Sequence, residues 1–179
     1  MKIVFKEYSS LSKTQSQEIL DIRNLDYIRK NMITNEIISL QNHLKWIESL
    51  KTNLEKKYFA VICENEVLGS CSWVKEEKNT FTWGIFFKDG VNPIISSCCA
   101  YLFLEDCFFN DKIERLGSLV RKENSMAFSF NKNFGFKIYK ENEEYFYLEL
   151  EKQKWENRKN SKLLKPIKNY LDKIDYEFK

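Results

Sequence analysis

The spacing of apolar positions predicts one strand and two helices in the first fifty residues. Ile3 to Phe5 form a short apolar run that suits a first strand. From Ser16 to Ile28 apolar residues recur at near-helical spacing, which predicts one continuous helix. Ser39 is a candidate N-cap for a second helix, because apolar residues follow it at steps of three and four. Those residues are Leu40, Leu44, Ile47 and Leu50.

The period of the pattern changes to two after residue 58. Three apolar runs, joined by short polar turns, predict three consecutive strands. The strands are Tyr58 to Cys63, Val67 to Lys75 and Phe81 to Phe87, and the turns are Glu64 to Glu66 and Glu76 to Asn79. Because the turns are short, we expect an antiparallel meander.

The second half of the chain alternates between helix and strand signals. Asn92 as N-cap and Pro93 at the first helical position predict a helix over Ile94 to Phe109. Further predicted elements are a strand at Arg115 to Val120, a helix at Ser125 to Phe134 capped by Asn124 and ended by Gly135, and strands at Phe136 to Tyr139 and Tyr145 to Leu150. The predicted fold class is α/β, with the order β-α-α-β-β-β-α-β-α-β-β.

Composition supports a chain that folds throughout. The 179 residues are 43% hydrophobic and 15% aromatic, with only two prolines, which is unlike a disordered chain or a linker. We expect one domain over residues 1–150 and a basic helical extension over residues 151–179. That extension carries nine Lys or Arg against five Asp or Glu. Its acids are interleaved with its bases, which favours a solvated surface over contact with nucleic acid or anionic lipid.

Cysteine usage and the N-terminus indicate a cytoplasmic location. The five cysteines lie in apolar runs without C-x-x-C spacing, so we expect no disulfide framework and no metal site. The start Met1-Lys-Ile-Val-Phe-Lys lacks the apolar stretch of a signal peptide. No run of residues is long and apolar enough for a membrane span.

One motif in the last predicted helix resembles a known family. Asn124-x-x-Ala127-x-x-x-Asn131-x-x-x-Gly135-Phe136 is similar to the helix motif of the GCN5-related N-acetyltransferases, in which a tyrosine stands where this chain has Asn131. Shorter blocks resemble the sugar-nucleotide acetyltransferases of the pseudaminic acid pathway. These blocks are Arg23-Asn24, Met32, Ile38-Ser39, His43-Leu44, Lys57-Tyr58-Phe59, Leu68-Gly69, Gly84-Ile85 and Tyr145-Phe146.

The resemblance implies the GCN5-related fold and an acetyl transfer. Acetyl-CoA would be the donor, and the 4-amino group of a UDP-linked 4-amino-4,6-dideoxy sugar would be the acceptor. A second hypothesis keeps the reaction but takes another amine. A third is a catalytically degenerate protein that binds a sugar nucleotide or a protein partner. A homodimer is left open.

The resemblance also implies where acetyl-CoA binds. The backbone of the third meander strand would pair with the pantetheine amides, the following loop and helix start would hold the pyrophosphate, and the last helix would contribute as well. The residues are Ile85, Phe86, Phe87, Gly90, Val91, Asn92, Asn124 and Ala127. The loop departs from the family's glycine-rich pattern, because Asp89 adds a negative charge and Pro93 lacks an amide donor. Lys88 is the residue expected to offset Asp89.

Two residues are candidates for catalysis, Ser72 and Asn131. By resemblance Ser72 would bind a water or the carbonyl, although an ordinary strand serine is the commoner explanation. Asn131 replaces the family's tyrosine, and an amide cannot act as a general acid. Leu119 stands where the sugar enzymes carry a glutamate. The residues at positions 131 and 119 both favour the catalytically degenerate binder. If the chain is instead an impaired enzyme, Asn131→Tyr should raise its reaction rate.

Five residues are candidates for substrate binding. The resemblance places Arg23 at the nucleotide phosphates; alternatively, Arg23 caps the first helix. His43, the only histidine, would bind the nucleotide or take the amine proton, or it makes a structural hydrogen bond. Trp46, on the same helix, would stack on the uracil or the sugar, or belongs to the core. Met32 lies in a matching block, and Lys75 would contact phosphate or is an exposed strand-end lysine.

Overall fold

The computed structural model describes residues 1–76 and 80–179, and these form two compact units. The first unit comprises residues 1–74, 84–92 and 173–179, and the second comprises residues 75–83 and 93–172. Strand β4 therefore contributes one half to each unit. The turn expected at Glu76 to Asn79 lies, apart from Glu76, outside the described residues. The α/β fold class predicted from the sequence is confirmed.

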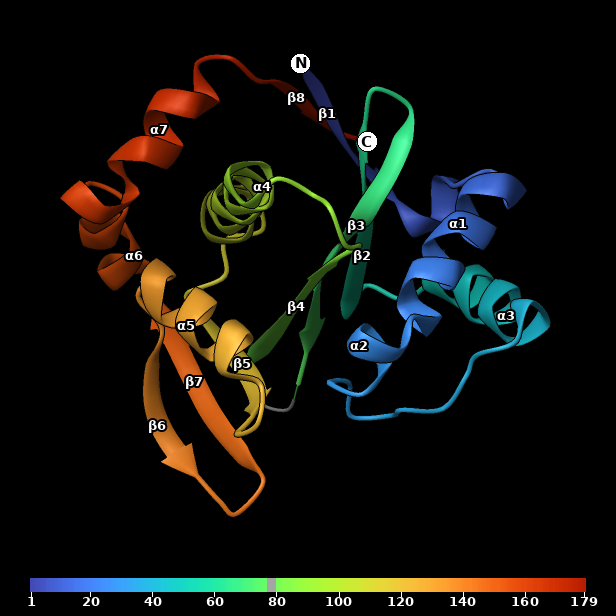
Figure 1. Cartoon of the computed structure of the whole chain (residues 1–179), viewed down its shortest axis with the longest axis horizontal. Helices are drawn as coiled ribbons and strands as arrows, with labels where there is room; N and C mark the ends of the chain where they lie inside the picture. The colour runs from blue at the N-terminus through green and yellow to red at the C-terminus, as the bar shows by residue number, and fades with distance from the viewer. Residues whose placement is uncertain (77–79) are drawn as a thin grey trace. The chain divides into compact units, whose positions relative to one another are not determined.

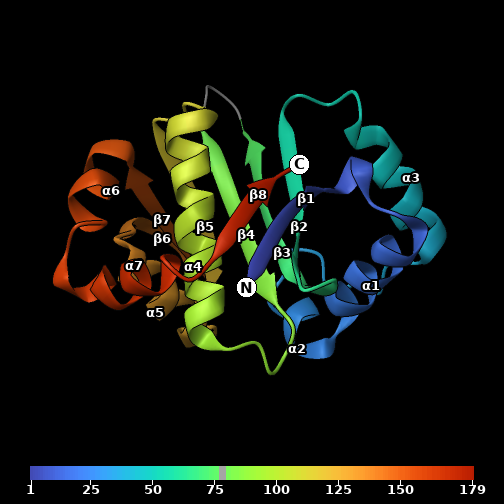
Figure 2. The same cartoon turned by 90° about the horizontal axis from the view of Figure 1, so that it is seen from above.

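The first unit contains a mixed sheet with the strand order β4-β3-β2-β1-β8. The strands are β1 (Lys2–Glu7), β2 (Lys56–Cys63), β3 (Glu66–Lys75), β4 (Phe81–Phe87) and β8 (Asp175–Phe178). β1 and β2 pair antiparallel, as do β2 and β3. The β2–β3 pair is the first pair of the predicted meander, and β4 lies next to β3 in the sheet. β8 instead runs parallel to β1, with Ile3 opposite Tyr176, and the two strands lie side by side in Figure 2.

The helices of the first unit lie together on one side of β2 and β3 (Figure 1). They are α1 (Lys13–Asn24), α2 (Asp26–Arg29) and α3 (Leu40–Leu50), after a 3-10 turn η1 (Tyr8–Ser10). Ser12 and Gln15 form a capping box that starts α1, and Ser39 caps α3 as expected. The prediction of one helix from Ser16 to Ile28 is wrong. Leu25, at ψ 135°, leaves the helical region and separates α1 from α2.

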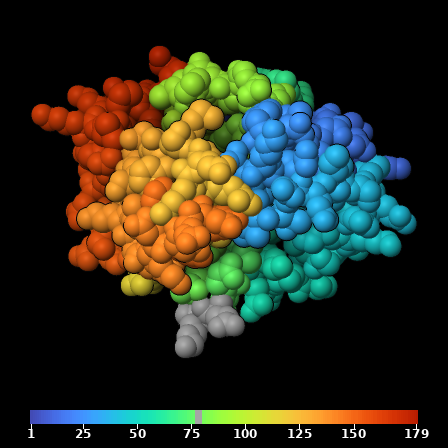
Figure 3. Space-filling model, turned by 60° about the horizontal axis from the view of Figure 1, so that its bottom comes forward, coloured from blue at the N-terminus to red at the C-terminus, as the bar shows by residue number. Residues whose placement is uncertain are grey.

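The second unit contains the strand order β6-β7-β5-β4, with only the first half of β4. Its elements are α4 (Pro93–Glu105) with a π-helical turn η3 (Asp106–Asn110), β5 (Arg115–Arg121), α5 (Ser125–Phe134), β6 (Lys137–Glu141) and β7 (Tyr145–Glu151). Phe81 pairs parallel with Leu116, whereas β5 and β6 both pair antiparallel with β7. Figure 3 shows α5 and the β6–β7 hairpin, both in shades of orange, next to each other at the surface.

The residues after 151 form more than a helical extension. Within the second unit they form α6 (Lys152–Arg158), a 3-10 turn η4 (Lys162–Leu164) and α7 (Lys165–Leu171). Trp155 and Leu164 are buried, so this segment is part of the unit's core. The last residues form β8 of the first unit, which the expectation of a helical extension missed. The domain boundary at residue 150 stays a prediction.

Membrane-spanning helices and metal-binding clusters are absent from residues 1–76 and 80–179. No helix in these residues is long and apolar enough to cross a membrane. They also contain no group of three or more His, Cys, Asp or Glu arranged to hold a metal ion. All five cysteines are free thiols.

Candidate active site

A cluster of aromatic rings surrounds His43 in the first unit. The His43 ring lies 5.7 Å from Trp46 and 6.2 Å from Tyr8, measured between centroids, and Trp46 meets Tyr58 edge-on at 4.8 Å. His43 is only 4% exposed, whereas Trp46 is half-buried. Two further predicted residues, Met32 and Phe86, pack against the hydrophobic cluster that contains Tyr8. The structure therefore groups Met32, His43, Trp46 and Phe86.

The burial of His43 determines its protonation state. Desolvation lowers its pKa, and a hydrogen bond to the Ser16 backbone opposes that shift only in part. The imidazole is therefore neutral at pH 7. Nε2 is buried and has no hydrogen-bond partner, which assigns the Ser16 bond to Nδ1. The neutral ring carries its proton on Nδ1, and the lone pair of Nε2 is free to accept a hydrogen bond.

Tyr8 and Ser70 form the polar part of the same cluster. The Tyr8 hydroxyl donates to Ser70 Oγ at 2.9 Å, and both side chains are buried. Burial raises the pKa of Tyr8 above its ordinary value, so the phenol stays protonated. Sequence reasoning missed both residues, because they are 62 positions apart and neither belongs to a recognisable motif.

The segment 30–38, between α2 and α3, is held by side chains of the two preceding helices. Asn24 exchanges two hydrogen bonds with the Ile38 backbone, at 2.9 and 3.0 Å. Arg29 donates to the Asn35 carbonyl at 2.6 Å and pairs with Asp26. These bonds order a segment that has no regular structure of its own.

Arg23 belongs to the same set of anchors. Its Nη2 donates to the Thr34 carbonyl at 2.7 Å, outside α1, so this bond does not cap the first helix. Its Nη1 is buried without a hydrogen-bond partner. Burial is the main cause that lowers the pKa of Arg23, and the positive charge of Arg29 adds to it. A cation in this setting favours an anionic ligand.

Close packing of β3 against β4 positions the predicted coenzyme strand. A Cβ atom built on Gly69 would lie 2.1 Å from the Phe86 carbonyl oxygen, so only glycine fits there. Ile85, Phe86 and Phe87 follow in the half of β4 that belongs to the first unit, and all three are half-buried. Ser72 Oγ lies 3.5 Å from the Gly84 carbonyl, a weak contact that leaves its hydroxyl available.

The loop after β4 keeps the conformation of a glycine-dependent turn. Gly90 has φ +80° and nothing within 4 Å of an added Cβ, and Val91 and Asn92 follow it. The Asp89 amide donates to the Tyr27 hydroxyl at 2.7 Å. The expectation that Lys88 offsets Asp89 needs correction, because Lys88 pairs with Glu66.

In the second unit the motif residues of α5 bond to one another. Asn124 Oδ1 accepts from the Ala127 amide at 3.0 Å, which is the predicted N-cap. Asn131 is buried, its Nδ2 donates to the Ala127 carbonyl at 2.8 Å, and its Oδ1 accepts from Trp83 Nε1 at 3.0 Å. Both polar atoms of Asn131 are engaged, so this geometry does not favour a catalytic role for it. Lys75 also belongs to this unit, at the end of β3, where it is half-buried.

Comparisons with known proteins extend this description. No protein family profile matches the chain. The acetyltransferase PseH from two strains of Campylobacter jejuni is 25% and 24% identical over 149 residues, which cover 82% of this chain and 92% of each relative.

Solved structures share the fold. The crystal structure of Campylobacter jejuni PseH in complex with acetyl coenzyme A aligns with a TM-score of 0.68 and 21% identity, covering 83% of this chain and 98% of that one. The chain therefore has the fold of the GCN5-related N-acetyltransferases (GNAT) and is similar in sequence to PseH. A second GNAT structure, apo FdhC, described as a nucleotide-linked sugar GNAT, aligns with a TM-score of 0.70 and 22% identity over 83% of this chain and 88% of that one.

Proposed function

We propose that this GNAT protein transfers an acetyl group from acetyl-CoA to the amino group of a nucleotide-linked amino sugar of the UDP-4-amino-4,6-dideoxy type. The observation that carries the proposal is the similarity to PseH, which extends over 149 residues. Five free cysteines suit a reducing compartment, so we place the reaction in the cytoplasm.

The first unit offers groups that suit the acetyl donor. Acetyl-CoA supplies a thioester-bound acetyl group when it is bound. Strand β4 would pair its backbone with the pantetheine amides through Ile85, Phe86 and Phe87. Nothing lies within 4 Å of a Cβ built on Gly90, so the pyrophosphate would approach the backbone of Val91 and Asn92 at this turn. The PseH structure that contains acetyl coenzyme A supports this donor.

His43 and Arg23 would recognise different parts of the acceptor. Because Nε2 of the neutral His43 is a hydrogen-bond acceptor, it would accept a hydroxyl, a ring N–H or an amine proton and would not bind a phosphate oxygen. Nε2 is buried, so this contact requires the surrounding rings to move. Arg23 would bind a phosphate through its guanidinium group, and because Nη1 is buried here, this contact requires the surrounding side chains to move. The other predicted site residues keep the roles that the family resemblance implies. They are Met32, Trp46, Ser72, Lys75, Asn124 and Ala127.

The reaction would proceed without a general acid from Asn131. The amine must reach the carbonyl in its neutral form, and a coenzyme thiol resembles a cysteine thiol, whose pKa is about 8.5, so its anion is a tolerable leaving group. Loss of a general acid lowers the rate by roughly 10²- to 10⁴-fold. We therefore expect a slow enzyme whose rate comes from positioning.

The geometry of Asn131 also favours a second candidate, a catalytically inactive GNAT protein that binds a sugar nucleotide or a protein partner. In this candidate the bonds of Asn131 to Trp83 and Ala127 mark a site that has become structural. Titration calorimetry separates the two candidates. Saturable binding of acetyl-CoA supports the enzyme, and binding of the UDP-sugar without any of acetyl-CoA supports the inactive binder.

An activity assay tests the reaction itself. The full chain is incubated with acetyl-CoA and the UDP-linked amino sugar, and thiol release is followed together with the mass of the product. We expect thiol release coupled to the addition of one acetyl group. UDP-N-acetylglucosamine, which has no free amine, is the negative control, and spermidine tests another amine. Thiol release with spermidine alone would refute the sugar acceptor.

A further inference from the structure

Helix α4 in the second unit is apolar on every side, so other elements must pack around it. All its residues from Cys98 to Leu104 are buried. A helix of this kind must be packed around its whole circumference. The segment after β7 supplies part of that cover, since Cys98 Sγ lies 3.8 Å from the Ile167 carbonyl of α7.

Trp155 of α6 joins α4 to α5. Its side chain is fully buried, and its ring lies 5.1 Å from Tyr101 of α4 and 6.2 Å from Phe134 of α5. One aromatic ring therefore packs against residues near the C-terminal ends of both helices.

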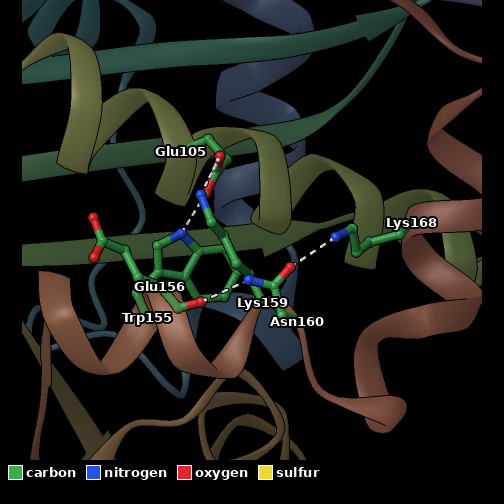
Figure 4. Close-up of polar contacts among 6 residues, drawn as sticks. All are labelled: Glu105, Trp155, Glu156, Lys159, Asn160 and Lys168. Carbon is green, nitrogen blue, oxygen red and sulfur yellow. Dashed lines mark hydrogen bonds and ion pairs between the residues drawn. The ribbon is translucent and has the colours of Figure 1, made fainter.

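Polar contacts fix the same end of α4 (Figure 4). Glu105, the last residue of the helix, accepts from Trp155 Nε1 at 2.5 Å and from Lys159 Nζ at 3.0 and 3.1 Å. Lys159 also lies over the Phe109 ring, 4.3 Å from its centroid. The pair is partly shielded from solvent, which makes it stronger than an exposed ion pair.

Arg158 holds the corresponding end of α5. Its Nε donates to the Asn133 carbonyl at 2.9 Å, one of the last carbonyls of the helix. Its aliphatic stem covers Gly135, where an added Cβ would lie 3.0 Å from Arg158 Cγ. A cation at this end also interacts favourably with the helix dipole.

We propose that Trp155, Arg158 and Lys159 form a clamp that fixes the C-terminal ends of α4 and α5 and thereby positions their N-terminal ends for acetyl-CoA. This inference rests on the proposed function, because α4 begins directly after the proposed pyrophosphate loop and α5 begins at Asn124. A rigid helix held at one end has a defined direction at the other. The clamp residues are positioning residues and do not touch the reacting atoms.

A matched pair of lysine variants tests the clamp. Lys159→Met removes the bond to Glu105, whereas Lys168→Met removes a 3.0 Å bond to Asn160 that stays within the extension. Both changes delete one hydrogen-bonded ammonium (Figure 4). The dissociation constant for acetyl-CoA is measured by calorimetry, with kcat, KM and Tm recorded in parallel. We expect Lys159→Met to raise the dissociation constant about tenfold, with KM for acetyl-CoA rising more than kcat falls. Lys168→Met should match the wild type, and Lys159→Arg should restore binding.

The outcomes separate the clamp from the proposed function. If Tm falls in Lys159→Met while the dissociation constant stays at the wild-type value, the contacts only stabilise the fold and the clamp is refuted. If Lys159→Met does not fold, Arg158→Met is measured instead and must weaken acetyl-CoA binding by a similar factor. If the wild type binds no acetyl-CoA, the proposed function fails, and the clamp fails with it.

Discussion

The hydrogen bond between Trp83 and Asn131 leads us to predict how much a substitution of Asn131 destabilises the second unit. Asn131→Leu keeps the approximate volume of the side chain but removes the acceptor for Trp83 Nε1, now at 3.0 Å. Trp83 is 4% exposed, so water does not reach the indole to replace the acceptor. The variant therefore leaves a buried donor without a partner.

The expected cost follows from that single group. An unsatisfied buried donor costs about 1–3 kcal/mol. The second bond of Asn131 adds little, because the Ala127 carbonyl lies inside α5, where the helix ladder supplies another donor. We expect the free energy of unfolding to fall by about 2 kcal/mol, a large part of the total of a typical domain, about 5–15 kcal/mol.

Urea denaturation checks this value, and a double-mutant cycle checks its cause. Trp83→Phe removes the donor, so the double variant should lose about 1 kcal/mol less than the sum of the two single variants. Asn133→Leu, the same change at an exposed position of α5, is the control and should cost about 0.5 kcal/mol or less. A cost for Asn131→Leu no larger than for Asn133→Leu, or an additive cycle, would refute the structural role. A loss of kcat beyond the loss of folded protein would instead give Asn131 a catalytic role.

Three further predictions concern other positions. Gly69→Ala should lower the free energy of unfolding by about 3 kcal/mol, because its Cβ would clash with the Phe86 carbonyl. Gly90→Ala, at φ +80° and with open space around it, should lower it by only about 1–2 kcal/mol. Equal melting temperatures of the two variants would contradict this prediction. The pKa of His43 lies below its ordinary value of 6.5, so the unfolded chain binds the proton more readily. The free energy of unfolding should therefore fall as the pH drops below 6.5 and level off below the pKa of His43 in the folded protein. His43→Gln should abolish this pH dependence, since the chain has no other histidine. If urea titrations of the variant gave the wild-type pH dependence, His43 would be excluded as its cause. Asn131→Tyr should not raise the acetyl-transfer rate, because Asn131 is buried and overpacking its position costs about 1–3 kcal/mol. A variant that is faster and as stable as the wild type would show that this position tolerates the tyrosine.

The elements that could be predicted from the sequence depend on local rules. Ser39 and Asn124 cap their helices as expected, and Gly135 ends α5 at φ +101°. Each of these signals acts within four residues of its own position. Similarly, the meander follows from alternating apolar residues and short polar turns.

The features that escaped prediction depend on contacts distant in sequence or have no marker. β8 is only four residues long and pairs with β1 at the opposite end of the chain, so its alternation of polar and apolar residues is too short to recognise. The break at Leu25 contains neither proline nor glycine. The Asn131 bond joins residues 48 positions apart, and the motif comparison could place Asn131 in the family's tyrosine position without showing its partner.

The two departures from the GNAT motif differ in their consequences for catalysis. The polar side-chain atoms of Asn131 are both hydrogen-bonded inside the second unit. The missing general acid raises the activation barrier by roughly 3–5 kcal/mol. At the loop the sequence changes, yet Gly90 keeps a positive φ and open surroundings, and the Asp89 amide is directed to Tyr27. Positioning of two reactants is worth about 7–11 kcal/mol. Under the proposed function, positioning depends on the loop and β4 rather than on Asn131. Because the positioning contribution exceeds the loss of the general acid, we expect acetyl transfer to persist despite the change at Asn131.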